Sequence, residues 1–107
     1  MTGGKLAAQA GHAYLSSFLN SQSSHPDLAS AYTADGLGTK VCLTSPNLEM
    51  LLWAYSAAQQ LGLPCALITD SGHKAFFNGE PTVTALGIGP VTEEQAKSIT
   101  RKFKLQP

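Results

Sequence analysis

Three short runs of strand-forming residues alternate with longer helical patterns along this chain of 107 residues. The runs cover residues 39–45, 64–69 and 82–89, and Gly, Pro or Ser residues bound each of them. Because strands separated by helices build crossover units, the alternation predicts an α/β sandwich with a largely parallel sheet. The length fits a single domain that covers residues 1–107.

Apolar periodicity predicts helices over residues 4–19, over 26–33 and over 47–61. A serine-rich loop is expected at 21–25, between the first two helices. A fourth helix begins at the capping box of residues 92–95, Thr-Glu-Glu-Gln, and directs its apolar face inward.

The third helix and the strand after it carry clear boundary signals. Ser45 can cap the helix, Pro46 is tolerated in its first turn, and Gly62 is the expected left-handed terminator. The following run, 64–69, is continuously apolar. This composition predicts a central strand that is buried on both faces.

Composition excludes several classes of protein. The formal net charge is zero and charged residues make up 13% of the chain, so a broadly positive nucleic-acid surface is not expected. Neither an apolar run of the roughly 18 residues that a membrane span needs nor a signal peptide is present in the sequence. Cys42 and Cys65 lack metal-site spacing, which predicts buried free thiols in a reducing compartment, no metal and a cytoplasmic protein.

A polar stripe opens the chain. Lys5, Gln9 and His12 are four and three residues apart, so their side chains lie along one face of the first helix. Lys5 is either a solvated lysine or a cation placed for an anion, and its unfavourable position near a helix start favours function. His12 is either a packed residue or a proton shuttle, and Gln9 is expected to orient a neighbour.

Asp70 follows the second strand run, where open α/β sheets place ligand-binding residues. Its alternative role is to cap the turn that it begins. Phe76 is either a stacking partner for a base or a core residue beneath the loop. Arg101 belongs to a basic group near the chain end that is either a solvated helix face or a phosphate contact.

Four blocks of sequence together resemble the type II, archaeal and eukaryotic, family of peptidyl-tRNA hydrolases. They are Gly4-Lys-Leu-Ala-Ala-Gln-Ala-Gly-His-Ala13, Leu61-Gly-Leu-Pro64, Asp70-Ser-Gly72 and Thr82-Val-Thr-Ala-Leu-Gly-Ile-Gly-Pro90. The resemblance implies a three-layer α/β/α sandwich with a small mixed, mostly parallel sheet. It also implies hydrolysis of the ester bond of peptidyl-tRNA without a metal or cofactor.

The residues themselves and the resemblance together lead us to expect roles for nine residues. Catalytic roles are expected for Lys5, His12 and Asp70. The residues expected to bind substrate are Gln9, Lys74, Phe76, Thr82, Thr84 and Arg101.

The chain departs from the family pattern in two places. Family members carry a strand ahead of the Gly-Lys motif, whereas only residues 1–3 precede it here. Either the reading frame is truncated, or the sheet closes without that strand, or a second copy in a homodimer supplies one. Lys74 also stands where the family has a threonine, so that hydroxyl is missing unless Thr82 or Thr84 takes its place. These departures keep open a noncatalytic relative that binds tRNA or protein.

Overall fold

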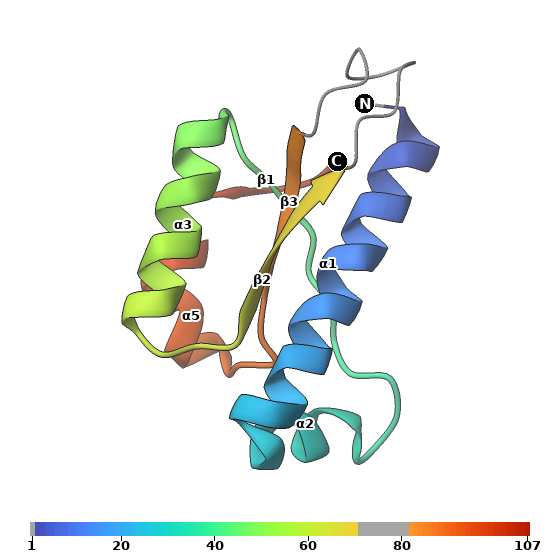
Figure 1. Ribbon diagram of the computed structural model, residues 1–107, viewed down its shortest axis with the longest axis vertical. Helices are drawn as coiled ribbons and strands as arrows, with labels where there is room; N and C mark the ends of the chain where they lie inside the picture. The colour runs from blue at the N-terminus through green and yellow to red at the C-terminus, as the bar shows by residue number, and fades with distance from the viewer. Residues whose placement is uncertain (1, 71–81) are drawn as a thin grey trace.

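The computed structural model describes residues 2–70 and 82–107, and within them it has four helices and four strands. The helices are α1 (Gly3–Ser24), α2 (Pro26–Thr33), α3 (Leu48–Gln60) and α5 (Glu93–Thr100). The strands are β1 (Leu43–Thr44), β2 (Cys65–Asp70), β3 (Thr82–Ile88) and β4 (Lys104–Leu105). α1 lies on one side of β2 and β3, and α3 and α5 lie on the other side (Figure 1). The predicted α/β class is confirmed.

The strand pairing differs from the mostly parallel sheet that the sequence predicts. β2 pairs with β3, and β1 pairs with β4 in a separate sheet; both pairs are antiparallel. Asp70 lies opposite Thr82, so the chain leaves and re-enters this sheet at the same end, without the crossover that parallel pairing requires. The parallel prediction is therefore wrong for the described strands. β2 has one neighbour among them, so its predicted central position is also wrong.

The first helix is longer than predicted. α1 continues through Ser24, whereas the sequence suggested a loop from residue 21. Two serine hydroxyls donate back to helix carbonyls: Ser21 to Phe18 at 2.6 Å and Ser24 to Asn20 at 3.0 Å. These local bonds satisfy the hydroxyls inside the helix, so the serine-rich segment does not have to leave it. α2 has the predicted bounds.

The first predicted strand is much shorter than expected. Only Leu43 and Thr44 pair, with β4, which the sequence analysis did not foresee. The Gln106 amide extends the contact by donating to the Cys42 carbonyl at 2.9 Å. Residues 39–42 have strand composition but no strand partner among the described residues, so composition alone does not make them a strand.

Capping explains the ends of α3 and α5. Asn47, not Ser45, is the N-cap of α3, and its side chain accepts a hydrogen bond from the Met50 amide at 2.9 Å. Gly62 has φ of 71°, which confirms the predicted terminator. The predicted capping box at the start of α5 is confirmed with both of its reciprocal bonds.

The core contains few large side chains. Its fully buried apolar residues in the described part are Ile99 and six alanines, Ala13, Ala29, Ala54, Ala58, Ala66 and Ala96. Trp53 is 39% exposed and lies at the surface beside Phe103. Cys42 and Cys65 are free, as predicted, but only half-buried. None of the described helices is long and apolar enough to cross a membrane.

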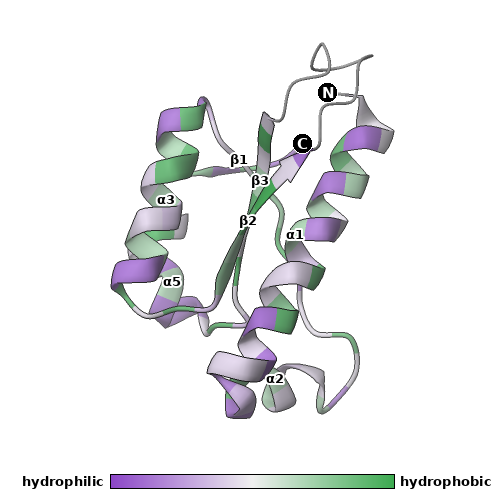
Figure 2. Cartoon of the chain, in the orientation of Figure 1, coloured by the Kyte–Doolittle hydropathy of each residue, from purple (hydrophilic) through white to green (hydrophobic). Residues whose placement is uncertain are grey.

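A close approach between α1 and β3 fixes the position of the first helix. A Cβ atom on Gly87 would lie 2.2 Å from the carbonyl oxygen of Ala13, so only glycine fits there. One turn further along α1, the buried Ser17 hydroxyl donates to the Gly89 carbonyl. These contacts hold the α1 axis against the sheet. β2 is apolar along most of its length and becomes polar at its carboxyl end, near the start of α1 (Figure 2).

Candidate active site

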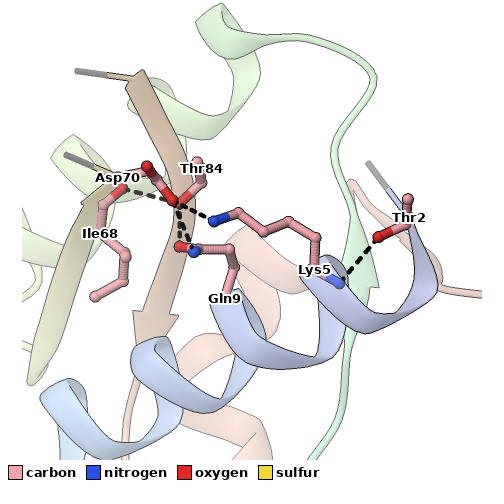
Figure 3. Close-up of polar contacts among 6 residues, drawn as sticks. All are labelled: Thr2, Lys5, Gln9, Ile68, Asp70 and Thr84. Atoms are coloured by element: carbon pink, nitrogen blue, oxygen red, sulfur yellow. Dashed lines mark hydrogen bonds and ion pairs between the residues drawn. The ribbon is translucent and has the colours of Figure 1, made fainter. Parts of the chain in front are cut away.

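An ion pair joins the start of α1 to the carboxyl end of β2. The Lys5 Nζ atom lies 2.5 Å from Oδ2 of Asp70, and the two side chains are 15% and 8% exposed (Figure 3). Thr2 caps the helix by accepting a hydrogen bond from the Lys5 amide at 3.2 Å. Lys5 is thus anchored in the first turn of α1, and its side chain extends away from the cap toward β2.

Gln9 lies one helical turn after Lys5 and binds the same carboxylate. Its Nε2 atom donates to Asp70 Oδ2 at 3.2 Å, and its Oε1 atom accepts from the Thr84 hydroxyl at 2.6 Å. Gln9 is 4% exposed, so the two bonds satisfy an amide that has almost no contact with water. The cluster therefore joins α1, β2 and β3.

The hydrogen-bond directions follow from the chemistry of the carboxylate. An ionised Asp70 only accepts hydrogen bonds, so the donor end of the Gln9 amide must face it. The acceptor end of Gln9 then faces Thr84, whose hydroxyl must donate. The chain Thr84 to Gln9 to Asp70 thus has a single consistent orientation. It holds the carboxylate in place from one side while Lys5 binds it from another.

A carboxylate and an ammonium group held together near water can serve hydrolysis. The carboxylate can accept a proton from a water molecule, and the ammonium can stabilise negative charge that develops on an oxygen. Across residues 2–70 and 82–107, no three or more His, Cys, Asp and Glu side chains come together in a group that could hold a metal ion.

Two further predicted residues lie near the cluster. Thr82 begins β3 directly opposite Asp70. His12 follows Gln9 by three residues on α1 and is exposed. Thr82 therefore lies at the same end of the sheet as Asp70, and His12 lies at the surface, one turn along α1 from Gln9.

The remaining predicted residues are elsewhere. Lys74 and Phe76 lie outside the described residues. Arg101 is the exposed C-cap of α5, which packs against α3 rather than against the start of α1. The basic residue thus does not join the cluster in the structure.

The sequence predicts every member of the described cluster as a site residue, but not the two partners of Gln9. Gln9 was expected to orient Lys5 or His12, whereas it binds Asp70 and Thr84. The spacing along α1 indicated that Lys5 and Gln9 share a face. It carried no information on which strand that face meets, because this depends on how α1 packs against β3 at Gly87.

The fold and the cluster together define a class: an α/β domain with a lysine and an aspartate paired at the carboxyl end of a strand. Comparison with known proteins identifies the family within this class. The sequence profile described as "Peptidyl-tRNA hydrolase PTH2" matches residues 1–106. The chain belongs to this family.

Similar proteins from archaea carry the same name. The peptidyl-tRNA hydrolase of Methanocaldococcus jannaschii is 35% identical over 102 residues, which are 95% of this chain and 86% of the relative. That of Methanococcus maripaludis strain C6 is 38% identical and covers 95% and 85% of the two chains. That of Methanothermobacter thermautotrophicus is 36% identical and covers 95% and 86%. The match spans both parts of the chain that contribute to the cluster.

Proposed function

We propose that this protein hydrolyses the ester bond of peptidyl-tRNA and releases a peptide and free tRNA. The observation that carries the proposal is the 2.5 Å pair between Lys5 and Asp70 in a chain that belongs to the peptidyl-tRNA hydrolase family. The exposed faces of both side chains are small, so a substrate would meet a charge pair that is already arranged. Such preorganisation is the main source of electrostatic catalysis.

The proposed chemistry divides the work between the two charged groups. Asp70 orients a water molecule and accepts its proton as the water oxygen attacks the ester carbonyl carbon. The Lys5 ammonium stabilises the oxyanion that develops on the carbonyl oxygen. When the tetrahedral intermediate collapses, the ester C–O bond breaks and the ribose oxygen takes up the proton that Asp70 accepted from water. The peptide is released with a free carboxyl group. No metal or cofactor is part of this proposal.

Gln9 and Thr84 have a positioning role in the proposal. Gln9 holds Asp70 Oδ2, and Thr84 fixes which end of the Gln9 amide faces the carboxylate. His12, exposed on the same helix, is proposed as a proton carrier for the leaving group. Thr82, Lys74, Phe76 and Arg101 are proposed contacts to the tRNA. We place the activity in the cytoplasm, where translation produces peptidyl-tRNA.

A hydrolysis assay tests the proposal. Purified protein is incubated with an N-blocked aminoacyl-tRNA, and free tRNA is measured with time. Asp70→Asn keeps the shape of the side chain but removes the base, so kcat is expected to fall about 100- to 1,000-fold. The matched control is Asp35→Asn, because Asp35 is an exposed aspartate far along the chain from the cluster. It should retain full activity.

The same variants separate the enzyme from a noncatalytic tRNA- or protein-binding relative. Affinity for the tRNA and its salt dependence are measured by filter binding for each variant. An enzyme that uses Asp70 loses turnover while its affinity changes little. A wild-type protein that binds tRNA and releases no peptide supports the alternative and contradicts the proposal. Full turnover by Asp70→Asn contradicts the assigned role of the carboxylate.

A further inference from the structure

The buried face of α1 is a single row of residues at fixed spacing. Its members are four positions apart, so they lie one after another along the helix: Gln9, Ala13, Ser17 and Ser21. α1 follows the β2–β3 pair along its length, and the first three members of the row contact these strands (Figure 1). The row therefore determines how the helix is placed on the sheet.

Ser17 binds the sheet at the end that lies away from the proposed active site. Its hydroxyl donates to the Gly89 carbonyl and lies 3.5 Å from the carbonyl oxygen of Pro64. The Gly89 amide donates to that same Pro64 oxygen at 2.7 Å, which closes the two strands at this end. Asp70 lies at the opposite end of β2. Ser17 thus joins α1 to the end of the sheet remote from the carboxylate.

The bond of Ser17 differs from those of two other serines on α1. Ser21 and Ser24 donate to carbonyls of their own helix, those of Phe18 and Asn20. Bonds of this kind satisfy a hydroxyl without involving another element. Ser17 is 3% exposed and donates outside its helix. Because a buried hydroxyl costs free energy unless it is bonded, the Ser17 bond and the position of α1 on the sheet depend on each other.

A close contact lies between Ser17 and the proposed active site along the helix. At Gly87 the Ala13 carbonyl oxygen leaves no room for a Cβ atom, so α1 cannot come closer to the sheet there. Ser17 is four residues after Ala13, and Lys5 is eight residues before it. At about 1.5 Å per residue, these separations are about 6 and 12 Å. If the helix tilts about this contact, Lys5 therefore moves about twice as far as Ser17.

We propose that Ser17 is a positioning residue for the proposed active site. By holding its end of α1 to the sheet, Ser17 sets the tilt of the helix, and this tilt places Lys5 and Gln9 against the carboxylate of Asp70. A displacement of about 1 Å can lower a rate about 100-fold, so a small tilt has a measurable effect. The effect on turnover rests on the proposed function, whereas the effect on the geometry of the cluster does not.

Two serine-to-alanine substitutions provide a matched test. Ser17→Ala removes the bond to the sheet. Ser21→Ala removes a hydroxyl of the same helix that is 0% exposed, but whose bond stays within α1. Hydrolysis of an N-blocked aminoacyl-tRNA is measured for both variants well below their unfolding temperatures. Ser17→Ala should lower kcat about tenfold while KM changes less than about twofold, and Ser21→Ala should leave both unchanged.

The side-chain amide of Gln9 reports on the geometry without any turnover. This group is buried and donates to Asp70 Oδ2 at 3.2 Å. It is eight residues from Ser17, about 12 Å along the helix, so the lost hydroxyl does not act on it directly. NMR of nitrogen-15-labelled protein follows its resonances and their exchange with water. Ser17→Ala should shift these resonances and speed the exchange, whereas Ser21→Ala should do neither.

A double substitution tests whether Ser17 acts through the cluster. Thr84→Val removes the hydroxyl that donates to Gln9, so it loosens the cluster at its other end. In that background, Ser17→Ala should lower kcat only about threefold, because the geometry it would disturb is already relaxed. Equal tenfold losses in both backgrounds would mean that the two residues act independently, and they would contradict the proposal.

Further outcomes would overturn the proposal. Either a wild-type kcat or an unchanged Gln9 amide in Ser17→Ala is sufficient, and so is an equal loss of turnover in Ser21→Ala. If Ser17→Ala does not fold, Ser17→Cys replaces it, because the thiol keeps a weak donor at the same position and should lower kcat by a smaller factor. A wild-type protein that releases no peptide contradicts the proposed function alone. A Gln9 amide that Ser17→Ala leaves unmoved would then still overturn this inference.

Discussion

The two edges of β3 have very different surroundings. The edge toward β2 is paired along its backbone, and α1 packs closely on the sheet at Gly87. The polar cluster lies on this side, and each of its described side chains has a partner. On the other edge, a cavity of about 1110 Å³ separates β3 from residues 39–45. All described members of the proposed active site therefore come from one half of the fold, α1 with β2 and β3.

The tightest contact on the β2 side predicts the largest effect. Gly87→Ala places a Cβ 2.2 Å from the Ala13 carbonyl oxygen, and backbone on both sides cannot move away easily. We expect the free energy of unfolding to fall by about 3 kcal/mol or more, because a side chain forced into a rigid, well-packed site destabilises the folded state. Urea denaturation followed by circular dichroism measures it.

Gly11→Ala is the matched control for that prediction. Gly11 lies inside α1, and no atom lies within 4 Å of a Cβ built there. Replacing a helical glycine by alanine should raise the free energy of unfolding by about 1 kcal/mol. If the two substitutions have equal effects, the contact between α1 and β3 is not as close as described.

A pair of alanine substitutions tests the packing contrast directly. Ala58 is 0% exposed in the core cluster, so Ala58→Leu should lower the free energy of unfolding by about 2 kcal/mol through overpacking. Ala10 lines the cavity and is half-buried, so Ala10→Leu should raise it by about 1 kcal/mol, because the added methylenes leave water without a clash. Thermal unfolding of both variants measures the difference. A loss of stability in Ala10→Leu would mean that the cavity is already filled.

Within the polar cluster, Thr84→Val removes the hydroxyl that donates to Gln9 Oε1 at 2.6 Å and lies 3.5 Å from the Ile68 carbonyl oxygen. Valine has nearly the shape of threonine but no donor, so Oε1 of the buried Gln9 loses its bond. An unsatisfied buried acceptor costs about 1 to 3 kcal/mol, and we expect about 1.5 kcal/mol here. Thr84→Ser keeps the hydroxyl and is the control.

The same variant reports on the proposed positioning role. If Gln9 holds Asp70 for catalysis, Thr84→Val should lower kcat while KM changes little, and Thr84→Ser should restore much of the lost rate. A variant that loses stability and keeps its kcat would show that the bond is structural only. The hydrolysis assay at a temperature well below unfolding separates these results.

Local signals made much of the fold predictable. The capping box at Thr92 and the terminator at Gly62 depend on neighbours in the sequence, and both predictions are confirmed. The serine-rich end of α1 was misjudged because serine favours both loops and back-bonded helix ends. Strand pairing was misjudged for a different reason. Helix and strand alternation indicates parallel pairs, but whether the chain crosses over between Asp70 and Thr82 is a tertiary property.

The candidate site shows the same limit. Helical spacing predicted that Lys5 and Gln9 share a face, and the position of Asp70 after a strand predicted a ligand-binding end. The contact of Lys5 and Gln9 with Asp70 requires α1 to pack closely across β3. Gly87 permits this close packing, but a glycine in the sequence does not by itself indicate where a helix will pack.

The smallest predicted effect lies at the surface. The Lys102 Nζ atom is 5.7 Å from the centre of the Trp53 ring, a cation–π contact at an exposed site. Lys102→Met keeps the apolar stem and removes the charge, so the free energy of unfolding should fall by about 0.5 kcal/mol. Lys102→Arg keeps the cation and should leave it unchanged. A loss as large as that expected for Thr84→Val would mean that this surface contributes as much to stability as the buried cluster. The packing on the two sides of β3 would then not be the main determinant of the stability of the molecule.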